Sequence, residues 1–366
     1  MNAYRQLLQM VSRRGQRGVS LIELMVAMTI GSVLIYGATQ VYVKSRNSYG
    51  ANEGVSRMQE TARYAMSVIE PDVRMSNFWG LLKGAGAITG QALQTAAAAA
   101  VAPGPAANIC GTNFAVDLST NLQGDNNNYA LSPTRQAGCN SLIDLDTGAA
   151  WTTTPVTTAD TLIVRRASVF TNAAPTANVL ELCTNRISGK LQSDVSACTA
   201  PPVGQLSNLI VDAYYIDRNS LQLAGLPALR RKTLSSGGVL QFVDQEIIPA
   251  IEDMQVQFGI DPTGNSGIAT RYVNPDAVPA TAQIVSVRVW LLVREDTAEQ
   301  GFTDTRIYEY GDRLQATGVT GDLNSAAGAG MAYQPSLNPD ATLQGPRHVR
   351  RLLITRTIMV RNAIGT

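Results

Sequence analysis

The sequence has little histidine and few of the side chains that catalytic sites need. Its 366 residues contain one histidine, His348, and four cysteines with no C-x-x-C pair. Structural zinc usually needs four cysteine or histidine ligands at close spacing, so this set argues against zinc. No G-x-x-x-x-G-K-[ST] loop, G-x-S-x-G elbow or H-E-x-x-H helix occurs. We therefore predict a protein that is not an enzyme and holds no metal or cofactor.

An excess of charge of one sign is lacking too. The 29 Lys and Arg against 28 Asp and Glu give a formal net charge of +1, so nucleic acid is not strongly attracted. Basic clusters do occur, at Arg165-Arg166, at Arg230-Arg231-Lys232 and between 347 and 361. Neighbours on a strand point to opposite faces, so these clusters are predicted to be solvated strand residues and not one patch for DNA. His348 is predicted to be a surface residue at the entrance of a strand.

One apolar run dominates the N-terminal part. Residues 19–43 carry a single charge, Glu23, and residues 1–18 before them carry four arginines, Arg5, Arg13, Arg14 and Arg17. The run is long enough to cross a bilayer, and the arginines place its start in the cytoplasm. A carboxylate inside such a span costs about 2.5–3.5 kcal/mol on insertion scales, which indicates a function or a partner for Glu23. The alternatives are an ordinary anchor that carries Glu23 by chance, or a secretory signal, whose apolar core of roughly 7–15 residues is too short.

Gly18 followed by Val19-Ser20-Leu21-Ile22-Glu23-Leu24 resembles the class III signal of type IV pilins and type II secretion pseudopilins. The resemblance implies that prepilin peptidase removes residues 1–18 by cutting between Gly18 and Val19. It also implies methylation of the new Val19 amine and a role in assembly for Glu23, the fifth residue of the mature chain. Loss of the leader arginines would change the formal net charge from +1 to −3. In a filament, the Val19 amine of a neighbouring subunit would approach the Glu23 carboxylate and offset its desolvation.

The helix is predicted to continue to about residue 75. Apolar residues recur at steps of three and four, which is typical of one buried stripe: Val55, Met58, Ala62, Ala65, Ile69 and Val73. Pro71 is expected to end or kink the helix between residues 69 and 75. Of the whole segment 19–75, residues 19–43 are the predicted transmembrane part and the remainder is amphipathic.

The rest of the chain is predicted to be a loop-rich connection, 76–160, and a β-sheet head, 161–366. Strands are expected at Thr161 to Phe170, Val179 to Cys183, Leu209 to Asp217, Ala228 to Thr233, Val239 to Val243, Ile247 to Asp261, Gln283 to Arg294 and Leu352 to Arg361, with one more near Arg306 to Tyr310. The low-complexity segment 311–346 is predicted to be a surface insertion. A long helix followed by an antiparallel sheet gives an α+β fold.

Segments spread along the chain resemble the PilW family of type IV pilus minor pilins: 57–65, 72–75, 251–261, 285–289 and 361–362. The resemblance implies a pilin-like fold and a structural subunit that primes pilus assembly and sits at the pilus tip. The implied partners are other minor pilins, the major pilin, a tip adhesin-like protein, prepilin peptidase and the inner-membrane assembly platform. The head would lie in the periplasm before assembly. A type II secretion minor pseudopilin and a membrane-anchored binding protein outside any filament are the alternatives.

The four cysteines lie beyond the membrane segment, where an even count predicts two disulfides. Three pairings are open, and proximity favours Cys110 with Cys139 and Cys183 with Cys198. The turn that begins at Asp261 resembles acidic, glycine-rich calcium loops, with Asp276 farther along. A β-turn in which Gly264 supplies positive φ is the preferred interpretation, because the turn itself holds one carboxylate.

Overall fold

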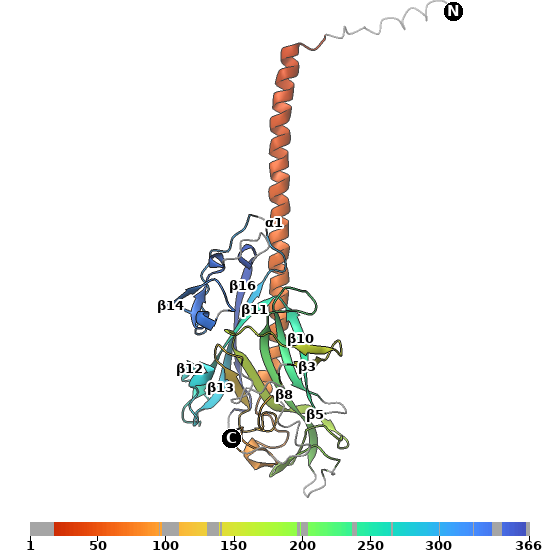
Figure 1. Ribbon diagram of the computed structural model, residues 1–366, viewed down its shortest axis with the longest axis vertical. Coiled ribbons are helices and arrows are strands. Elements are labelled where there is room, and N and C mark those ends of the chain that lie inside the picture. The colour runs from red at the N-terminus through yellow and green to blue at the C-terminus, as the bar shows by residue number, and fades with distance from the viewer. Residues whose placement is uncertain are drawn as a thin grey trace, which may run out of the picture. The chain divides into compact units, whose positions relative to one another are not determined.

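The computed structural model describes residues 18–94, 96, 110–129, 139, 141–195, 198, 204–235, 240–264, 266–299, 301–324, 326–338 and 346–363. The chain divides into two compact units, Met1–Glu53 and Gly54–Thr366. Helix α1 (Leu21–Met75) begins in the first unit and ends in the second, which we call the head (Figure 1).

The first part of α1 is apolar and exposed. In the described part of the chain, α1 is the one helix that is long and apolar enough to cross a membrane. Its hydroxyl side chains bond back to the helix: Thr29 Oγ1 donates to Val26 O at 2.9 Å and Thr39 Oγ1 to Ile35 O at 2.8 Å. These hydroxyls are thus satisfied without water, as an apolar environment requires.

Within the head, α1 buries one stripe of side chains. The buried apolar members are Met58, Ala62, Ala65, Met66, Ile69 and Val73. The prediction is wrong for Val55, which is 37% exposed. Gly54 is the buried residue there, because the Glu295 side chain lies where a Cβ would be, with Oε1 1.9 Å from that position.

Pro71 does not end the helix at once. It lies on the exposed side of α1, and the helix continues to Met75. The proline removes one backbone donor, but the packed stripe on the opposite side holds the last turn in place. The helix ends at Met75, and Asn77, two residues later, has a left-handed backbone with φ of +62°.

The larger sheet comprises ten strands among the described residues, mostly antiparallel. They are β1 (Ile88–Thr89), β2 (Leu122–Asp125), β3 (Ser141–Asp144), β4 (Ala150–Thr152), β5 (Thr161–Asn172), β6 (Glu181–Thr184), β7 (Gly189–Gln192), β8 (Gln205–Asp217), β9 (Ala228–Leu234) and β10 (Phe242–Pro249). Strand β8 pairs with β5, β6 and β9, and β2 pairs with β5. The pairs β1 with β7 and β3 with β10 are parallel, unlike the predicted arrangement.

The smaller sheet is antiparallel throughout, in the order β12-β11-β13-β16. Its strands are β11 (Ile251–Asp261), β12 (Arg271–Val273), β13 (Gln283–Arg294) and β16 (Arg351–Met359). Two short strands, β14 (Leu314–Thr320) and β15 (Met331–Tyr333), form a parallel pair. Short 3₁₀ helices are η1 (Ala85–Ala87), η3 (Pro275–Ala277), η4 (Ala326–Gly328), η5 (Pro335–Leu337) and η6 (Pro346–His348).

The main core contains side chains from α1, from the larger sheet and from the smaller sheet. Ile69 of α1, Tyr214 of β8 and Val289 of β13 are all fully buried in it. A second core lies around Trp79 and Phe114. The segment predicted as a loop-rich connection, 76–160, therefore carries buried aromatic residues and short strands.

Three strand predictions and the insertion need correction. The strand predicted at Ile247 to Asp261 is two strands, because Ala250 has φ of +68° and interrupts it. Strand β10 starts at Phe242 and not at 239, which lies outside the described residues. The segment predicted near Arg306 to Tyr310 forms only isolated bridges. Part of 311–346 is core and not surface, since Arg313 is fully buried.

Candidate assembly site

The predicted cleavage site is exposed and lies outside the helix. Gly18, Val19 and Ser20 precede α1 and have no regular secondary structure. Val19 is 73% exposed, and no other atom lies within 4 Å of the position a Cβ on Gly18 would take. The peptide bond between Gly18 and Val19 is therefore accessible in an extended segment. Residues 1–17 lie outside the described part.

Ser20 and Glu23 form a capping box at the start of α1. The backbone N–H of Ser20 donates to Glu23 Oε2 at 2.9 Å, and the backbone N–H of Glu23 donates to Ser20 Oγ at 3.4 Å. The pair satisfies two backbone donors that a helix start leaves free. Sequence reasoning missed this role, although a serine three residues before a glutamate is its usual signal.

The capping box also bears on the charge of Glu23. A carboxylate in the first turn is favoured by the positive end of the helix dipole, by about 0.3–1 kcal/mol. This contribution and one hydrogen bond are smaller than the 2.5–3.5 kcal/mol cost of a central membrane carboxylate on insertion scales. A separate cation is therefore still favourable at Glu23.

At its other end, α1 is fixed to the larger sheet by Asp72. Arg166 on β5 donates to Asp72 Oδ1 from Nη2 at 2.6 Å and from Nε at 3.1 Å. The Tyr214 hydroxyl on β8 donates to Asp72 Oδ2. Asp72 is 5% exposed, so these charge-assisted bonds act in a low dielectric. The last turn of α1 is thus held by an ion pair that sequence reasoning did not predict.

A second carboxylate, Asp212, lies in the same cluster. Arg231 Nη1 is 3.5 Å from Asp212 Oδ2 and 3.9 Å from Asp72 Oδ2, so one guanidinium serves two acids. Burial, and then the negative charge of Asp72, raise the pKa of Asp212 to about 7. The Tyr214 pKa is likewise raised by burial and by both carboxylates, so this hydroxyl stays a donor. The cluster is therefore sensitive to pH near neutrality.

Two known family models match this chain, one in its C-terminal part and one at its N-terminal end. The family described as type IV pilus-assembly protein W matches residues 213–362, and the prokaryotic N-terminal methylation motif matches residues 13–39. A PilW domain behind a prepilin methylation motif supports a type IV minor pilin of the PilW family. This family consists of structural pilins. The N-terminal signal and the apolar helix indicate membrane anchoring and incorporation into a pilus. Membership of the type IV pilins also implies interaction with other pilus components.

The matched regions contain the segments at 251–261, 285–289 and 361–362 that carry the PilW resemblance; those at 57–65 and 72–75 lie outside them. Among solved structures, the type IV-like pilin TTHA1219 from Thermus thermophilus is 12% identical over 57% of this chain and 79% of its own, with a TM-score of 0.24. No curated protein matches the chain.

In this PilW-family pilin, the basic clusters are mostly buried, which corrects the prediction that they are solvated. Arg230 is fully buried and donates to Asp144 at 2.6 Å, Asp244 at 2.7 Å and Glu246 at 3.0 Å. Its guanidinium carbon also lies 4.0 Å from the centre of the Trp151 ring. One cation thus neutralises carboxylates from β3 and β10.

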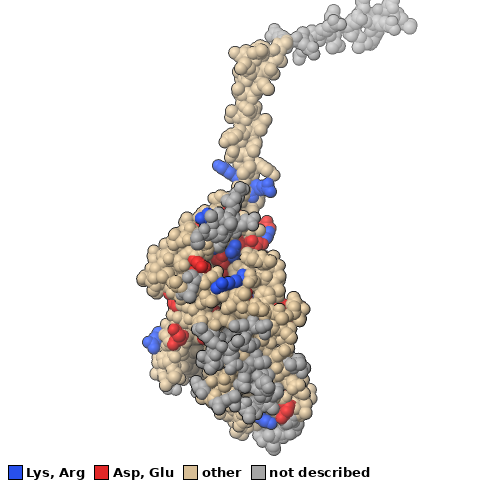
Figure 2. All heavy atoms as spheres, in the orientation of Figure 1, with Lys and Arg blue, Asp and Glu red and all other residues tan. Residues whose placement is uncertain are grey.

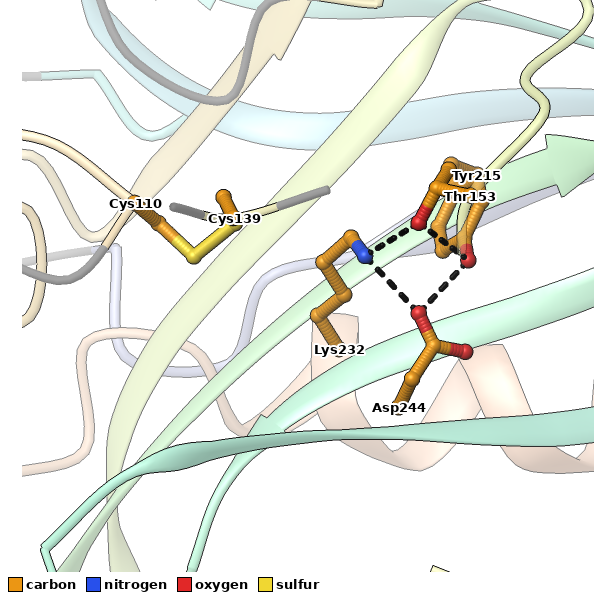
Figure 3. Close-up of a disulfide and its surroundings, with 6 residues drawn as sticks. All are labelled: Cys110, Cys139, Thr153, Tyr215, Lys232 and Asp244. Atoms are coloured by element: carbon orange, nitrogen blue, oxygen red, sulfur yellow. Dashed lines mark hydrogen bonds and ion pairs between the residues drawn. A yellow bond between two sulfur atoms is a disulfide. The ribbon is translucent and has the colours of Figure 1, made fainter. Parts of the chain in front are cut away.

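Lys232, two residues along β9, is buried in the same region (Figure 3). Its Nζ donates to Asp244 Oδ2 at 2.8 Å and to Thr153 Oγ1 at 2.7 Å, and the Tyr215 hydroxyl donates to the same Asp244 oxygen at 2.6 Å. Burial lowers the pKa of Lys232, and Asp244 opposes that effect. These side chains hold β8, β9 and β10 together.

Most of the remaining basic residues of these clusters also have hydrogen-bond or ion-pair partners within the head. Arg165 is buried and donates to Phe114 O at 3.0 Å, and Arg351 is buried against Glu252 at 2.5 Å. Arg356 lies on the surface and pairs with Glu70 at 2.7 Å. The charges on the face drawn in Figure 2 are scattered and of both signs. On that face the described charges form no continuous basic patch.

His348 lies half-buried in η6, just before β16. Its Nδ1 is 2.7 Å from Phe302 O, and Arg347 Nε donates to its Nε2 at 3.0 Å. Both ring nitrogens are thus engaged in local structure, rather than exposed at the surface as predicted.

The turn after β11 has the β-turn conformation that was preferred. Gly264 has φ of +66°, and the Asp261 carboxylate accepts bonds from Thr263, Ser266 and Gly267. The hydroxyls of Ser266 and Thr263 hold the pKa of Asp261 well below its usual range. Asp276 is exposed in η3. The described residues contain no group of three or more His, Cys, Asp or Glu placed to hold a metal.

Both disulfides favoured by proximity are present. Cys110 pairs with Cys139 at a Cα–Cα distance of 4.5 Å, and Cys183 with Cys198 at 5.6 Å. The first is buried in the second core. The second closes the region between β6 and β8 and packs against Gly204. Disulfides suit a head exposed to an oxidising compartment.

Proposed function

We propose that this pilin is cut between Gly18 and Val19 by prepilin peptidase, is methylated at the Val19 amine, and enters a filament through Glu23. Before assembly its head would lie in the periplasm and α1 in the inner membrane. It would then join other minor pilins in a complex that contacts the major pilin, a tip adhesin-like protein and the assembly platform. That complex would prime the pilus and remain at its tip.

The observation that carries this proposal is the start of α1. The scissile bond is exposed and extended, the capping box starts the helix two residues later, and Glu23 follows inside the apolar segment. Cleavage creates a positive amine at Val19, close to the depth of Glu23 in a parallel neighbour. An ion pair between the two would offset the desolvation cost of each group. The PilW head distinguishes this subunit from a general secretion pseudopilin.

The test is a count of surface pili by electron microscopy in a strain that lacks the gene. The strain is complemented with the intact gene, with Glu23→Ala or with Glu60→Ala, a matched change at an exposed glutamate on the same helix. We expect near-complete loss of pili, restored by the intact gene and by Glu60→Ala but not by Glu23→Ala. Unchanged pilus numbers would contradict the proposal and direct attention to protein secretion.

Processing is tested separately by mass spectrometry of the N-terminal peptide. We expect a chain that begins at a methylated Val19 in the intact protein. A chain that still begins at Met1 would refute cleavage, whatever the pilus count.

A further inference from the structure

One face of the smaller sheet carries an arginine stacked between aromatic rings. The guanidinium carbon of Arg288 on β13 lies 3.9 Å from the centre of the Tyr272 ring and 5.7 Å from that of Trp290. Its Nε donates to Thr357 Oγ1 on β16 at 3.3 Å. All three stacked side chains are half-buried. Tyr272 on β12, Arg288 on β13 and Thr357 on β16 therefore form a row across the sheet. We call these three residues the stacked row; Trp290 lies beside it on β13.

The stacked row is built into the sheet. Tyr272 lies opposite Gly259 on β11, where a Cβ would come within 3.0 Å of the Tyr272 ring and 2.2 Å of Ser286 Oγ. Because Gly259 has no side chain, the Tyr272 ring can pack against the β11 backbone there. The Ser286 hydroxyl donates a hydrogen bond to the Tyr272 hydroxyl oxygen at 3.2 Å. The guanidinium is thus held by its surroundings before any partner arrives, which lowers the entropy cost of binding.

Arg288 has no carboxylate partner among the described residues, a property that it shares on this sheet with Arg271 of β12. On the same sheet, Arg294 and Arg351 both pair with Glu252, and Arg356 pairs with Glu70. A stacked guanidinium still presents its two terminal nitrogens as a fork that fits a carboxylate. Arginine, tyrosine and tryptophan are also the residues enriched at the centres of protein interfaces. The stacked row is therefore complementary to an acidic side chain.

Beside the stacked row, β16 leaves one edge of the sheet free. It pairs with β13 over nine residues in continuous register without a bulge, and no other described strand pairs with it. Thr355, Arg356, Thr357 and Met359 are exposed along it. Natural proteins usually shield an edge of this length with a proline, a bulge or a cover. Charged side chains can shield an edge too, and along β16 the described residues supply one exposed charge, Arg356, which pairs with Glu70 of α1. An edge with no paired strand is suited to the addition of a strand from a partner.

We propose that an extended segment of another pilin head adds to the free edge of β16 and sets an Asp or Glu side chain against the Arg288 guanidinium. This docking site rests on the proposed function, since it supplies the contact by which this minor pilin would join its complex. The partner is recognised by two properties together, an extended backbone and a carboxylate on the face of the stacked row.

The test is photocrosslinking of the full chain in piliated cells. A photoreactive phenylalanine analogue is placed at Thr355, and in a control strain at Phe170, which is 79% exposed on β5. We expect a crosslink from position 355 to another pilin, within two residues of an Asp or Glu, and none to that pilin from position 170. No crosslink from 355, or one to a glycan, lipid or DNA, would overturn the docking site.

Variants of the guanidinium make the test specific. Arg288→Lys should reduce the crosslink roughly tenfold, as for an interface residue of the kind that dominates binding. Arg271→Lys, at an exposed arginine on β12, should leave it unchanged. Equal loss in both, or none in Arg288→Lys, would refute the role of Arg288. Arg288→Glu should be rescued by replacing the partner's crosslinked acid with arginine, which a folding defect would not allow.

The two proposals fail in different ways. Normal pilus numbers in the deletion strain would refute the proposed function and the docking site with it. Lost pili in the deletion strain, together with no crosslink from position 355, would refute the docking site alone.

Discussion

Replacing Asp212 by asparagine should remove the contribution of this carboxyl to the pH dependence of head stability between pH 5 and 8. Asp212 is buried beside Asp72, and both share Arg231. Burial and the charge of Asp72 raise its pKa to about 7 from the ordinary value of 3.8. In the folded head Asp212 is therefore protonated below pH 7, whereas in the unfolded chain it is ionised above about pH 4.

The sign and size follow from that difference. A carboxyl whose folded pKa is raised stabilises the fold fully at low pH and loses this contribution as the pH rises to its folded pKa. At about 1.4 kcal/mol per pKa unit, the whole loss is about 4 kcal/mol, of which about 2.5 kcal/mol falls between pH 5 and 8. Asparagine keeps an amide donor for Asp72 and cannot ionise, so the variant should not show this loss.

The assay is the thermal midpoint of the full chain in detergent at several pH values. At 2–4 °C per kcal/mol for a domain of this size, the whole loss of about 4 kcal/mol means that Asp212→Asn should melt roughly 8–16 °C above the unmodified protein at pH 8. The two should melt much closer together at pH 5. Asp276→Asn, a change at an exposed aspartate, is the control and should follow the unmodified protein. Parallel curves for Asp212→Asn and the unmodified protein would refute the reasoning.

Two further predictions concern the core of the head. Arg230→Met should leave Asp144 and Glu246 buried without their cation and lower the free energy of unfolding by about 3–5 kcal/mol, or prevent folding; a urea titration that shows less than 1 kcal/mol of change would contradict the buried network. Replacing Cys183 and Cys198 together by serine should cost about 3 kcal/mol, because their pairing closes a loop of 15 residues. The unmodified protein after reduction should lose at least as much free energy of unfolding in the same titration. No loss in either protein would contradict a stabilising role for this disulfide.

The sequence was sufficient for features that depend on local pattern. The apolar run, its single glutamate and the stripe of α1 follow from spacing along one helix, and Gln283 to Arg294 alternates so regularly that the predicted strand has the observed bounds. The capping box at Ser20 was equally readable, because its signal lies within four residues. Proximity in the chain was also enough to favour the two disulfides that formed.

What sequence reasoning missed depends on residues far apart in the chain. Arginines and lysines are usually solvated, so the basic clusters were expected at the surface; yet Arg230 is buried because β3 and β10 supply three carboxylates around it. Arg313 is drawn into the core by Asp253, which precedes it by 60 residues. No local pattern announces such pairs.

The sequence by itself therefore determined what kind of protein this is: a membrane-anchored pilin with a β-rich head. Its helix and signal are recognised by periodicity and by a motif that act within a few turns of chain. The tertiary structure decided which charges are buried, how Asp72 fixes α1 to the sheet, and that Arg288 has no acidic partner among the described residues. Those properties arise from cross-strand neighbours, and the chain order does not specify neighbours until the sheets have paired.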